Sequence, residues 1–335
     1  MNIYSVGSKS YGSTLGTLPT PTRPGYNFKG WFTSPSGGTQ ITSSTTIPAG
    51  DKVYYALWEQ IAAPTISVVN KYPNGSTYSG AWTNQSLTSV ITYSAPSGTT
   101  INPSSLAWSC DGTNWSTISN SNTSTFTDSW GAERNNSACY YRICNTAGVC
   151  GTTPAFAIRI DKTVPSAPTA MEFVYGDWSR YTQGTWTNQS VYAGSTSASP
   201  GPSGATDNLS GVLKYQISSD NSNWVDYSYA YSASDTIYSM HSDGTHTRYF
   251  RAVDNAGNVS SSISRTAKID KTAPTIGTVT TDGSKVYVTV SDSGSKVSAY
   301  YTEDGLNDFM YSIPYVDISD VSSYNISFNP YETNE

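Results

Sequence analysis

The chain has 335 residues, enough for two to four domains, and a formal net charge of −6. Its 18 basic residues are scattered rather than clustered, which argues against nucleic acid as a partner. No apolar run approaches the ~20 residues that cross a bilayer, so we expect no insertion into a membrane.

Residue usage predicts β-structure along the whole chain. Charged residues make up only 13% of it, but 26 Tyr and 9 Trp supply large side chains for burial. Thr, Val and Tyr favour strands, whereas the many Gly, Asn, Asp, Pro and Ser residues favour turns. No segment combines a helical period with capping signals. We therefore expect an all-β fold made of tandem small domains.

The first domain, residues 1–60, carries three dense motifs: Arg23–Tyr26, Gly30–Phe32 and Tyr55–Trp58. Pro24-Gly25 is a turn signal, and the aromatic residues are large enough to form most of a small core. With these motifs the segment resembles the Listeria–Bacteroides repeat, the internalin-type B repeat of bacterial surface proteins. The resemblance implies a β-grasp-like domain. Most of the family's usual opening strand is missing, so we expect an N-terminally truncated unit.

The middle of the chain repeats itself. The stretch Tyr140–Pro165 recurs as Tyr249–Pro274, with Tyr, Arg, Ala-Gly and Ile-Asp-Lys-Thr in the same places. Because a repeated unit decides the architecture, these markers divide the region into domains 62–162 and 163–272. Each is close to the ~100 residues of an immunoglobulin-like sandwich.

Two motifs relate this region to a family. Arg251–Asn258 and Ile269–Thr275 are similar to the immunoglobulin-like repeats of large bacterial surface proteins and adhesins. The resemblance implies a hairpin between the last two strands and a short junction. Proline at the junction fixes its own φ and restricts the residue before it, so the junction has little freedom to bend.

The last segment, residues 273–335, begins a further unit of the same kind. Lys285–Asp292 alternates as a second strand does, and Val297–Thr302 is typical of a third. The hairpin motif does not follow, so we expect a partial or abbreviated immunoglobulin-like domain.

All four cysteines lie in the first long copy: Cys110, Cys139, Cys144 and Cys150. Reduced core thiols are one interpretation, and a zinc site is another, although the spacing lacks a C-x₂-C pair and no His lies nearby. Strand geometry favours a third. The segment ending at Cys110 is expected beside the one starting at Cys139, and Cys144 and Cys150 flank a hairpin turn. Cys139–Cys150 would require a slipped hairpin. We predict disulfides 110–139 and 144–150, and therefore an oxidising compartment.

No motif for catalysis stands out, and we expect no enzyme activity. The two histidines, His241 and His246, are interpreted as polar loop residues rather than metal ligands. Oxygen-rich loops raise calcium as a cofactor. They are Asp207–Gly211 and Asp254–Asn258, with Asp161 and Asp270 at the junctions. The favoured interpretation is that Asp and Asn serve the turns themselves.

A ligand surface is predicted in the second copy, where a Tyr-rich insertion has no counterpart in the first. Exposed aromatic rings stack on sugars and dock proteins, which makes host glycan or a surface protein the expected partner. The candidate residues are Trp178, Tyr181, Tyr227, Tyr229 and Tyr231.

These observations predict a non-catalytic, extracellular segment of a bacterial cell-surface protein that acts as a stalk, spacer or adhesin region. The alternatives are a module that binds glycan or host protein, and the accessory region of a large secreted enzyme. We expect a monomeric fragment of a longer chain.

Overall fold

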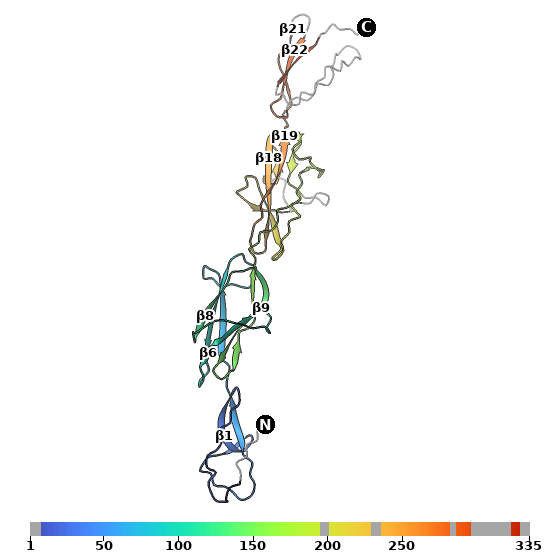
Figure 1. Cartoon of the computed structure of the whole chain (residues 1–335). Coiled ribbons are helices and arrows are strands. Elements are labelled where there is room, and N and C mark those ends of the chain that lie inside the picture. The colour runs from blue at the N-terminus through green and yellow to red at the C-terminus, as the bar shows by residue number, and fades with distance from the viewer. Residues whose placement is uncertain (1–7, 195–200, 229–235, 282–285, 296–322, 329–335) are drawn as a thin grey trace. The chain divides into compact units, whose positions relative to one another are not determined.

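The structure is a computed structural model, and it describes residues 8–194, 201–228, 236–281, 286–295 and 323–328 (Figure 1). Every regular element in these ranges is a strand, so the predicted all-β fold is confirmed. Within the same ranges there is no helix long and apolar enough to span a bilayer. The chain divides into two compact units, Met1–Lys162 and Thr163–Glu335.

The N-terminal segment of the first unit forms a small antiparallel sheet. Its strands, in the order β2-β1-β3, are β1 (Tyr26–Ser34), β2 (Gly37–Ile41) and β3 (Tyr55–Gln60). Phe28 contacts Trp31 and Trp58, with ring centroids 5.7 and 5.4 Å apart. These rings are half-buried, whereas Leu15 and Ile41 are buried. The most buried hydrophobic positions are thus aliphatic, and the aromatic contacts are partly exposed.

Residues 62–162 form a sandwich of two sheets, the arrangement of an immunoglobulin-like domain. One sheet has the order β4-β5-β8, and the other has the order β10-β9-β6-β7 with β11 also pairing with β9. The strands are β4 (Thr65–Lys71), β5 (Leu87–Ser94), β6 (Ile101–Ser109), β7 (Ser116–Thr117), β8 (Thr125–Trp130), β9 (Arg134–Asn145), β10 (Cys150–Thr152) and β11 (Phe156–Ile160).

Alternation along the strands builds the core of this sandwich. In β9, the side chains of Cys139, Tyr141 and Ile143 are all fully buried, as the sequence predicts for one face of this strand. In β5, Leu87 and Ile91 point into the same core from the opposite sheet. The core therefore lies between the two sheets and belongs to this domain.

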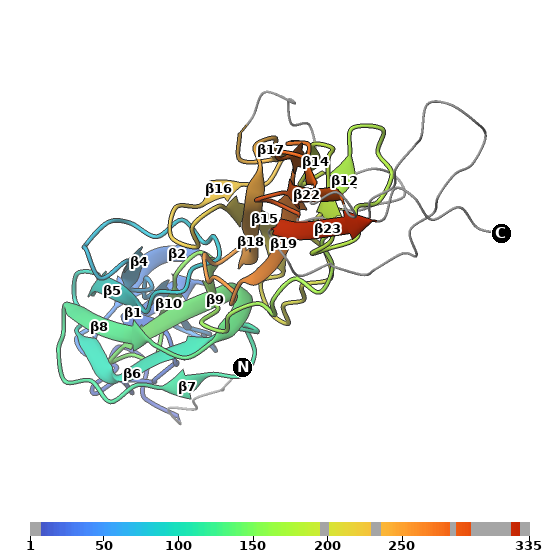
Figure 2. The ribbon, with the colours of Figure 1, turned by 90° about the horizontal axis from the view of Figure 1, so that it is seen from above.

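The second unit contains the second sandwich, with its own core cluster. Its larger sheet has the order β13-β19-β18-β15-β16, and β15, β18 and β19 lie close together in Figure 2. The smaller sheet, β12-β14-β17, consists of two-residue strands. The strands are β12 (Val174–Tyr175), β13 (Trp186–Thr187), β14 (Val191–Tyr192), β15 (Val212–Ser218), β16 (Val225–Asp226), β17 (Ser239–Met240), β18 (Gly244–Asp254) and β19 (Ile263–Ile269).

The C-terminal segment has one further sheet, in which β22 pairs with three other strands. The strands are β20 (Thr275–Ile276), β21 (Thr280–Thr281), β22 (Val286–Ser291) and β23 (Ser323–Phe328). β22 falls within the predicted second strand, Lys285–Asp292. The predicted third strand, Val297–Thr302, lies outside the described residues.

Candidate functional site

The two disulfide bonds of the first sandwich join the pairs that the sequence predicts. Cys110 is bonded to Cys139, and Cys144 is bonded to Cys150. Cys110 directly follows β6, which pairs with β9 and so brings it beside Cys139. Cys144 and Cys150 are direct partners across the β9–β10 hairpin. No cysteine is free, so the reduced-thiol and zinc interpretations are wrong.

The bonds differ in their surroundings. Cys139 is fully buried in the core, whereas Cys150 is exposed. The Cys110–Cys139 bond therefore crosslinks two adjacent core strands, and the other bond closes a surface hairpin.

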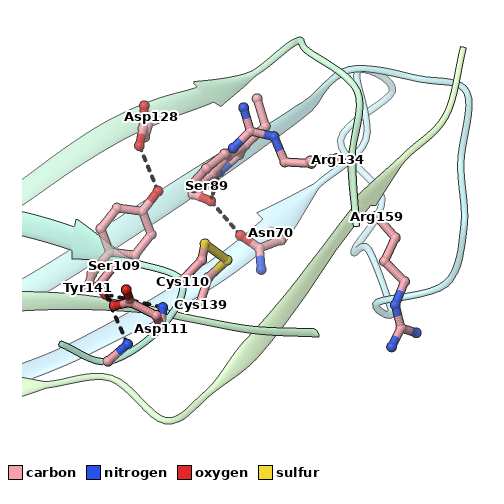
Figure 3. The surroundings of a disulfide bond; sticks show 12 residues. Asn70, Ser89, Ser109, Cys110, Asp111, Asp128, Arg134, Cys139, Tyr141 and Arg159 are labelled. Atoms are coloured by element: carbon pink, nitrogen blue, oxygen red, sulfur yellow. Dashed lines mark hydrogen bonds between the residues drawn. A yellow bond between two sulfur atoms is a disulfide. The ribbon is translucent and has the colours of Figure 1, made fainter. Parts of the chain in front are cut away.

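A chain of buried polar groups lies near the core disulfide (Figure 3). The Trp130 indole Nε1 donates a hydrogen bond to Ser89 Oγ at 2.7 Å, and Ser89 Oγ donates to Asn70 Oδ1 at 2.5 Å. The Tyr141 hydroxyl donates to Asp128 Oδ2 at 2.8 Å. Burial raises the pKa of Tyr141 well above its ordinary value, so this hydroxyl remains a donor. The first two bonds join neighbouring strands of the β4-β5-β8 sheet, whereas the Tyr141–Asp128 bond joins β9 to β8 and so links the two sheets.

An aspartate closes the turn after β6 in the first sandwich and the matching turn after β15 in the second. The side chain and backbone N–H of Asn114 donate to Asp111 at 2.6 and 2.7 Å, and these bonds hold the pKa of Asp111 well below its usual range. In the second copy, the backbone N–H and side chain of Asn223 do the same for Asp220. These acidic residues thus serve the turns.

The tryptophans that recur after these turns are also structural. The Arg142 guanidinium lies 4.3 Å from the centre of the Trp115 ring, and Arg251 lies 4.1 Å from that of Trp224. Each pair is a cation–π contact between an arginine on β9 or β18 and the tryptophan that directly precedes β7 or β16. These repeated tryptophans therefore pack within their own sandwich.

The predicted ligand surface is corrected by the structure. Tyr181 and Tyr227 are buried in the core of the second sandwich, with exposed fractions of 6% and 9%. The Tyr181 hydroxyl donates to the carbonyl of Thr185 and accepts from the Lys268 N–H, and Tyr227 packs against Phe250. A tyrosine can be buried because its ring is apolar while its hydroxyl finds a partner.

The other predicted ligand residues have different positions. Tyr229 and Tyr231 lie outside the described residues. Trp178 is 52% exposed and lies at the tip of a hairpin. Of the predicted set, Trp178 is the one that the described residues place on the surface.

The loops suggested for calcium are mostly occupied by their own hydrogen bonds. Both oxygens of the Asp254 carboxylate accept from Asn258, at 2.8 Å each, and Asp207 Oδ2 accepts from the Gly211 N–H at 2.6 Å. Asp207 Oδ1 is buried with no hydrogen-bond partner among the described residues, and oxygens of Asp207 and Asp254 lie within 4.8 Å. Two carboxylates are few for an ion that takes six to eight oxygens, so calcium stays a prediction.

The junction aspartates also have backbone contacts within their own unit. The Asp161 N–H donates to the carbonyl of Thr83 at 2.9 Å. Asp270 accepts from the N–H groups of Ser295 and Thr272, and these bonds lower its pKa.

The two histidines do not share a partner. His241 Nδ1 lies 2.9 Å from Ser190 Oγ, and His246 Nε2 lies 2.7 Å from the carbonyl of Ser242. His241 lies in a loop, as predicted, whereas His246 lies on β18 opposite Ala267, so its interpretation as a loop residue is wrong.

Sequence reasoning missed a contact that both copies make at their exit. Lys162 Nζ donates to Ser86 Oγ and to the carbonyl of Gly131, at 3.0 and 2.7 Å. Its backbone N–H donates to Glu133 Oε1 at 3.0 Å. The lysine of the junction motif therefore ties the exit segment back to two loops of its own sandwich. We call this set of contacts the exit clamp.

The exit clamp is repeated in the second copy. Lys271 Nζ donates to Ser190 Oγ at 2.9 Å, and the Lys271 N–H donates to Asp243 Oδ1 at 2.7 Å. Thr272 Oγ1 donates to Asp243 Oδ2 at 2.6 Å. The sequence did contain a signal for this contact, because two motifs recur together in both copies. Ile-Asp-Lys-Thr supplies the lysine, and Trp-Thr-Asn-Gln-Ser supplies the serine.

Comparisons with known proteins give a family match for one segment and likenesses among solved structures. A comparison with curated proteins gives no match. Among solved structures, the fibronectin(III)-like modules of Clostridium thermocellum CbhA are similar at 12% sequence identity, with a TM-score of 0.28. That likeness covers 61% of this chain and 94% of the other. Residues 3–57 match the model of the Listeria-Bacteroides repeat domain, so the N-terminal segment carries the repeat that its motifs indicate.

Proposed function

We propose that this chain is a non-catalytic, extracellular segment of a bacterial cell-surface protein, in which small β-domains act in series as a stalk. The Listeria-Bacteroides repeat at residues 3–57 supports an extracellular bacterial surface or enzyme-associated setting. The two disulfide bonds support it as well, because such bonds persist outside the reducing cytosol.

The exit clamp carries the mechanical part of the proposal. A stalk must pass a pulling force from one domain to the next through the short segment that joins them. In both copies, the lysine at the start of this segment is tied to a loop within its own sandwich: through Ser86 to the loop before β5, or through Ser190 to the loop before β14. A load on the exit is thus shared between the last strand and a second point of the same sandwich.

A domain that bears load also benefits from crosslinks between its strands. The Cys110–Cys139 bond closes a loop across 29 residues of sequence. These residues cannot extend while the bond is intact. The first sandwich is therefore expected to lengthen less under force than the second.

Single-molecule force spectroscopy on residues 1–335 tests this role. We expect the two sandwiches to unfold in separate steps. Reduction of both bonds should lengthen the first sandwich by ~13 nm, from sequence separations of 29 and 6 residues at ~3.6 Å per residue. A single joint unfolding step for both copies would contradict a stalk of independent domains.

The location is tested separately. Antibodies against the second sandwich should label intact cells that express the protein, without permeabilisation. Labelling that appears only after permeabilisation would contradict the surface location and leave the mechanical result unaffected.

A further inference from the structure

The second sandwich presents a tryptophan where a hairpin turn calls for glycine. Trp178 has φ of 67°, in the left-handed region that L-residues rarely adopt. Its side chain is 52% exposed, the largest exposed fraction of any tryptophan among the described residues. Burial therefore does not explain why a large ring occupies this position.

The first copy shows what the turn requires on its own. There the same position is Gly75, with φ of 86°. The Tyr72 N–H donates to the Ser76 carbonyl and the Gly75 N–H donates to the Tyr72 carbonyl, both at 2.9 Å. Glycine adopts this conformation without steric cost, so it is the residue that the backbone favours.

The second copy repeats these bonds with tryptophan in place. The Tyr175 N–H donates to the Ser179 carbonyl at 2.9 Å, and the Trp178 N–H donates to the Tyr175 carbonyl at 3.0 Å. Asp177 Oδ1 accepts from the N–H and the hydroxyl of Ser179, at 2.9 and 2.6 Å. The indole is therefore not needed to form the turn, and it is kept at the expense of backbone strain. Strain of this kind is typical of binding sites.

The turn holds the indole on a fixed base. The ring of Tyr175 contacts that of Tyr181 edge to face, with centroids 5.7 Å apart, and Tyr181 belongs to the buried core. A tryptophan on such a base loses little freedom when a ligand covers it, which favours binding.

The neighbours of Trp178 are polar and charged. Asp177 precedes it, and Arg180 follows one residue later, with its Nε 2.8 Å from an oxygen of Glu172. A protein partner is expected to bury a wider apolar area around an anchoring tryptophan. A pyranose ring with equatorial hydroxyls matches an apolar indole with polar neighbours, because one face of the sugar carries C–H groups and its rim carries hydroxyls.

We propose that the Trp178 turn is a carbohydrate-binding site, in which the indole stacks on the apolar face of a pyranose with equatorial hydroxyls. Asp177 and Arg180 flank the ring and supply hydrogen-bond partners for its hydroxyls. The site is independent of a mechanical role, since a stalk and a glycan contact can share one domain.

The test measures binding of residues 1–335 to three probes by calorimetry and pull-down. The probes are cellohexaose, which is a β-1,4-glucan, chitohexaose, which is a β-1,4-linked N-acetylglucosamine chain, and intact peptidoglycan sacculi. We expect binding to at least one. Binding to chitohexaose and sacculi would identify bacterial wall glycan as the source, and binding to cellohexaose alone would identify a glucan from outside the wall.

Trp178→Gly is the decisive variant, because the first copy shows that the turn forms with glycine. We expect at least tenfold weaker binding, together with an unchanged or higher melting temperature of the second sandwich. Trp186→Ala is the matched control: Trp186 is also exposed, at 40%, and lies on β13 instead of the turn. It should bind as the wild type does.

Three results would overturn the proposal: wild-type protein that binds none of the probes, Trp178→Gly protein that binds as tightly as the wild type, or an equal loss of binding in Trp186→Ala. None of these depends on how the domains respond to force, so the stalk function is judged separately.

Discussion

In the first sandwich, Asn70, Ser89 and Trp130 form a buried hydrogen-bonded chain. In the second sandwich the matching positions hold apolar side chains, which cannot form such a chain. They are Phe173, Ala193 and Met240, in the same order. The strand registers support the match, because Leu87 lies opposite Trp130 as Val191 lies opposite Met240. The core disulfide differs in the opposite direction, since the charged and hydrogen-bonded Arg248 stands where the first copy has Cys139.

The comparison teaches that interior residues change as a set. A single buried polar group without its partner is costly, so removal of one member of a chain favours removal of the others. The outward features, by contrast, recur in both copies: the Asp–Asn turn, the Arg–Trp contact and the exit clamp. Each copy thus keeps its surface supports and varies its core.

The largest difference between the copies should come from the core disulfide. Replacement of Cys110 and Cys139 by serine should lower the free energy of unfolding of the first sandwich by ~3–4 kcal/mol, because the unfolded chain gains freedom. The second sandwich has no cysteine and should be unaffected. Thermal melts of the full chain with and without reductant measure both, and equal shifts of the two transitions would contradict the assignment.

The next effect concerns the polar chain. Ser89→Ala should lower the free energy of unfolding of the first sandwich by about 2–3 kcal/mol, because it leaves the Trp130 N–H and the Asn70 amide without their partner. The triple variant Asn70→Phe, Ser89→Ala, Trp130→Met copies the second core and should lose less than the sum of its single variants. Urea denaturation gives these values, and strict additivity would show that the set is not coupled.

A smaller effect is expected at Arg248, which anchors the second sandwich where Cys139 anchors the first. Its guanidinium donates to the carbonyls of Ile237, Thr236 and Thr247, at 2.6 to 3.1 Å. Arg248→Met keeps much of the side-chain volume and removes these bonds, at a cost of about 2 kcal/mol. Hydrogen exchange should then rise first near residues 236–240, and unchanged exchange there would argue against the anchor.

The smallest effect is a dependence on pH that both copies share. Hydrogen bonds lower the pKa of Asp111 and Asp220 in the folded state, so the stability they supply is present above the unfolded pKa of ~3.9 and is lost as pH falls further. We therefore expect Asp220→Asn to reduce the amount by which the melting temperature of the second sandwich changes between pH 7 and pH 3. The melting temperature of the first sandwich, which keeps Asp111, is the internal control and should change with pH as much as it does in the wild type.

The parts of the fold that depend on local pattern could be predicted from the sequence. Alternation in Cys139–Cys144 gave the buried face of β9, and the order of strands in a sandwich gave both disulfide pairs. The match of residues 3–57 to the Listeria-Bacteroides repeat was also visible in short motifs.

The parts that failed depend on contacts between distant segments. The sequence predicts Tyr181 and Tyr227 as surface residues because a Tyr-rich insertion in the second copy has no counterpart in the first. Their burial depends on partners such as the Lys268 N–H and Phe250, which no local pattern reveals. The exit clamp was missed for the same reason, since Lys162 and Ser86 lie far apart in sequence.

The exit clamp has a consequence for how such a protein changes over generations. Every group in it comes from the same copy: Lys162 with Ser86, Gly131 and Glu133, and Lys271 with Ser190 and Asp243. A recombination event that duplicates or deletes one whole copy therefore carries a complete set of partners with it. Selection can then tune the number of copies in an array without first redesigning the neighbours.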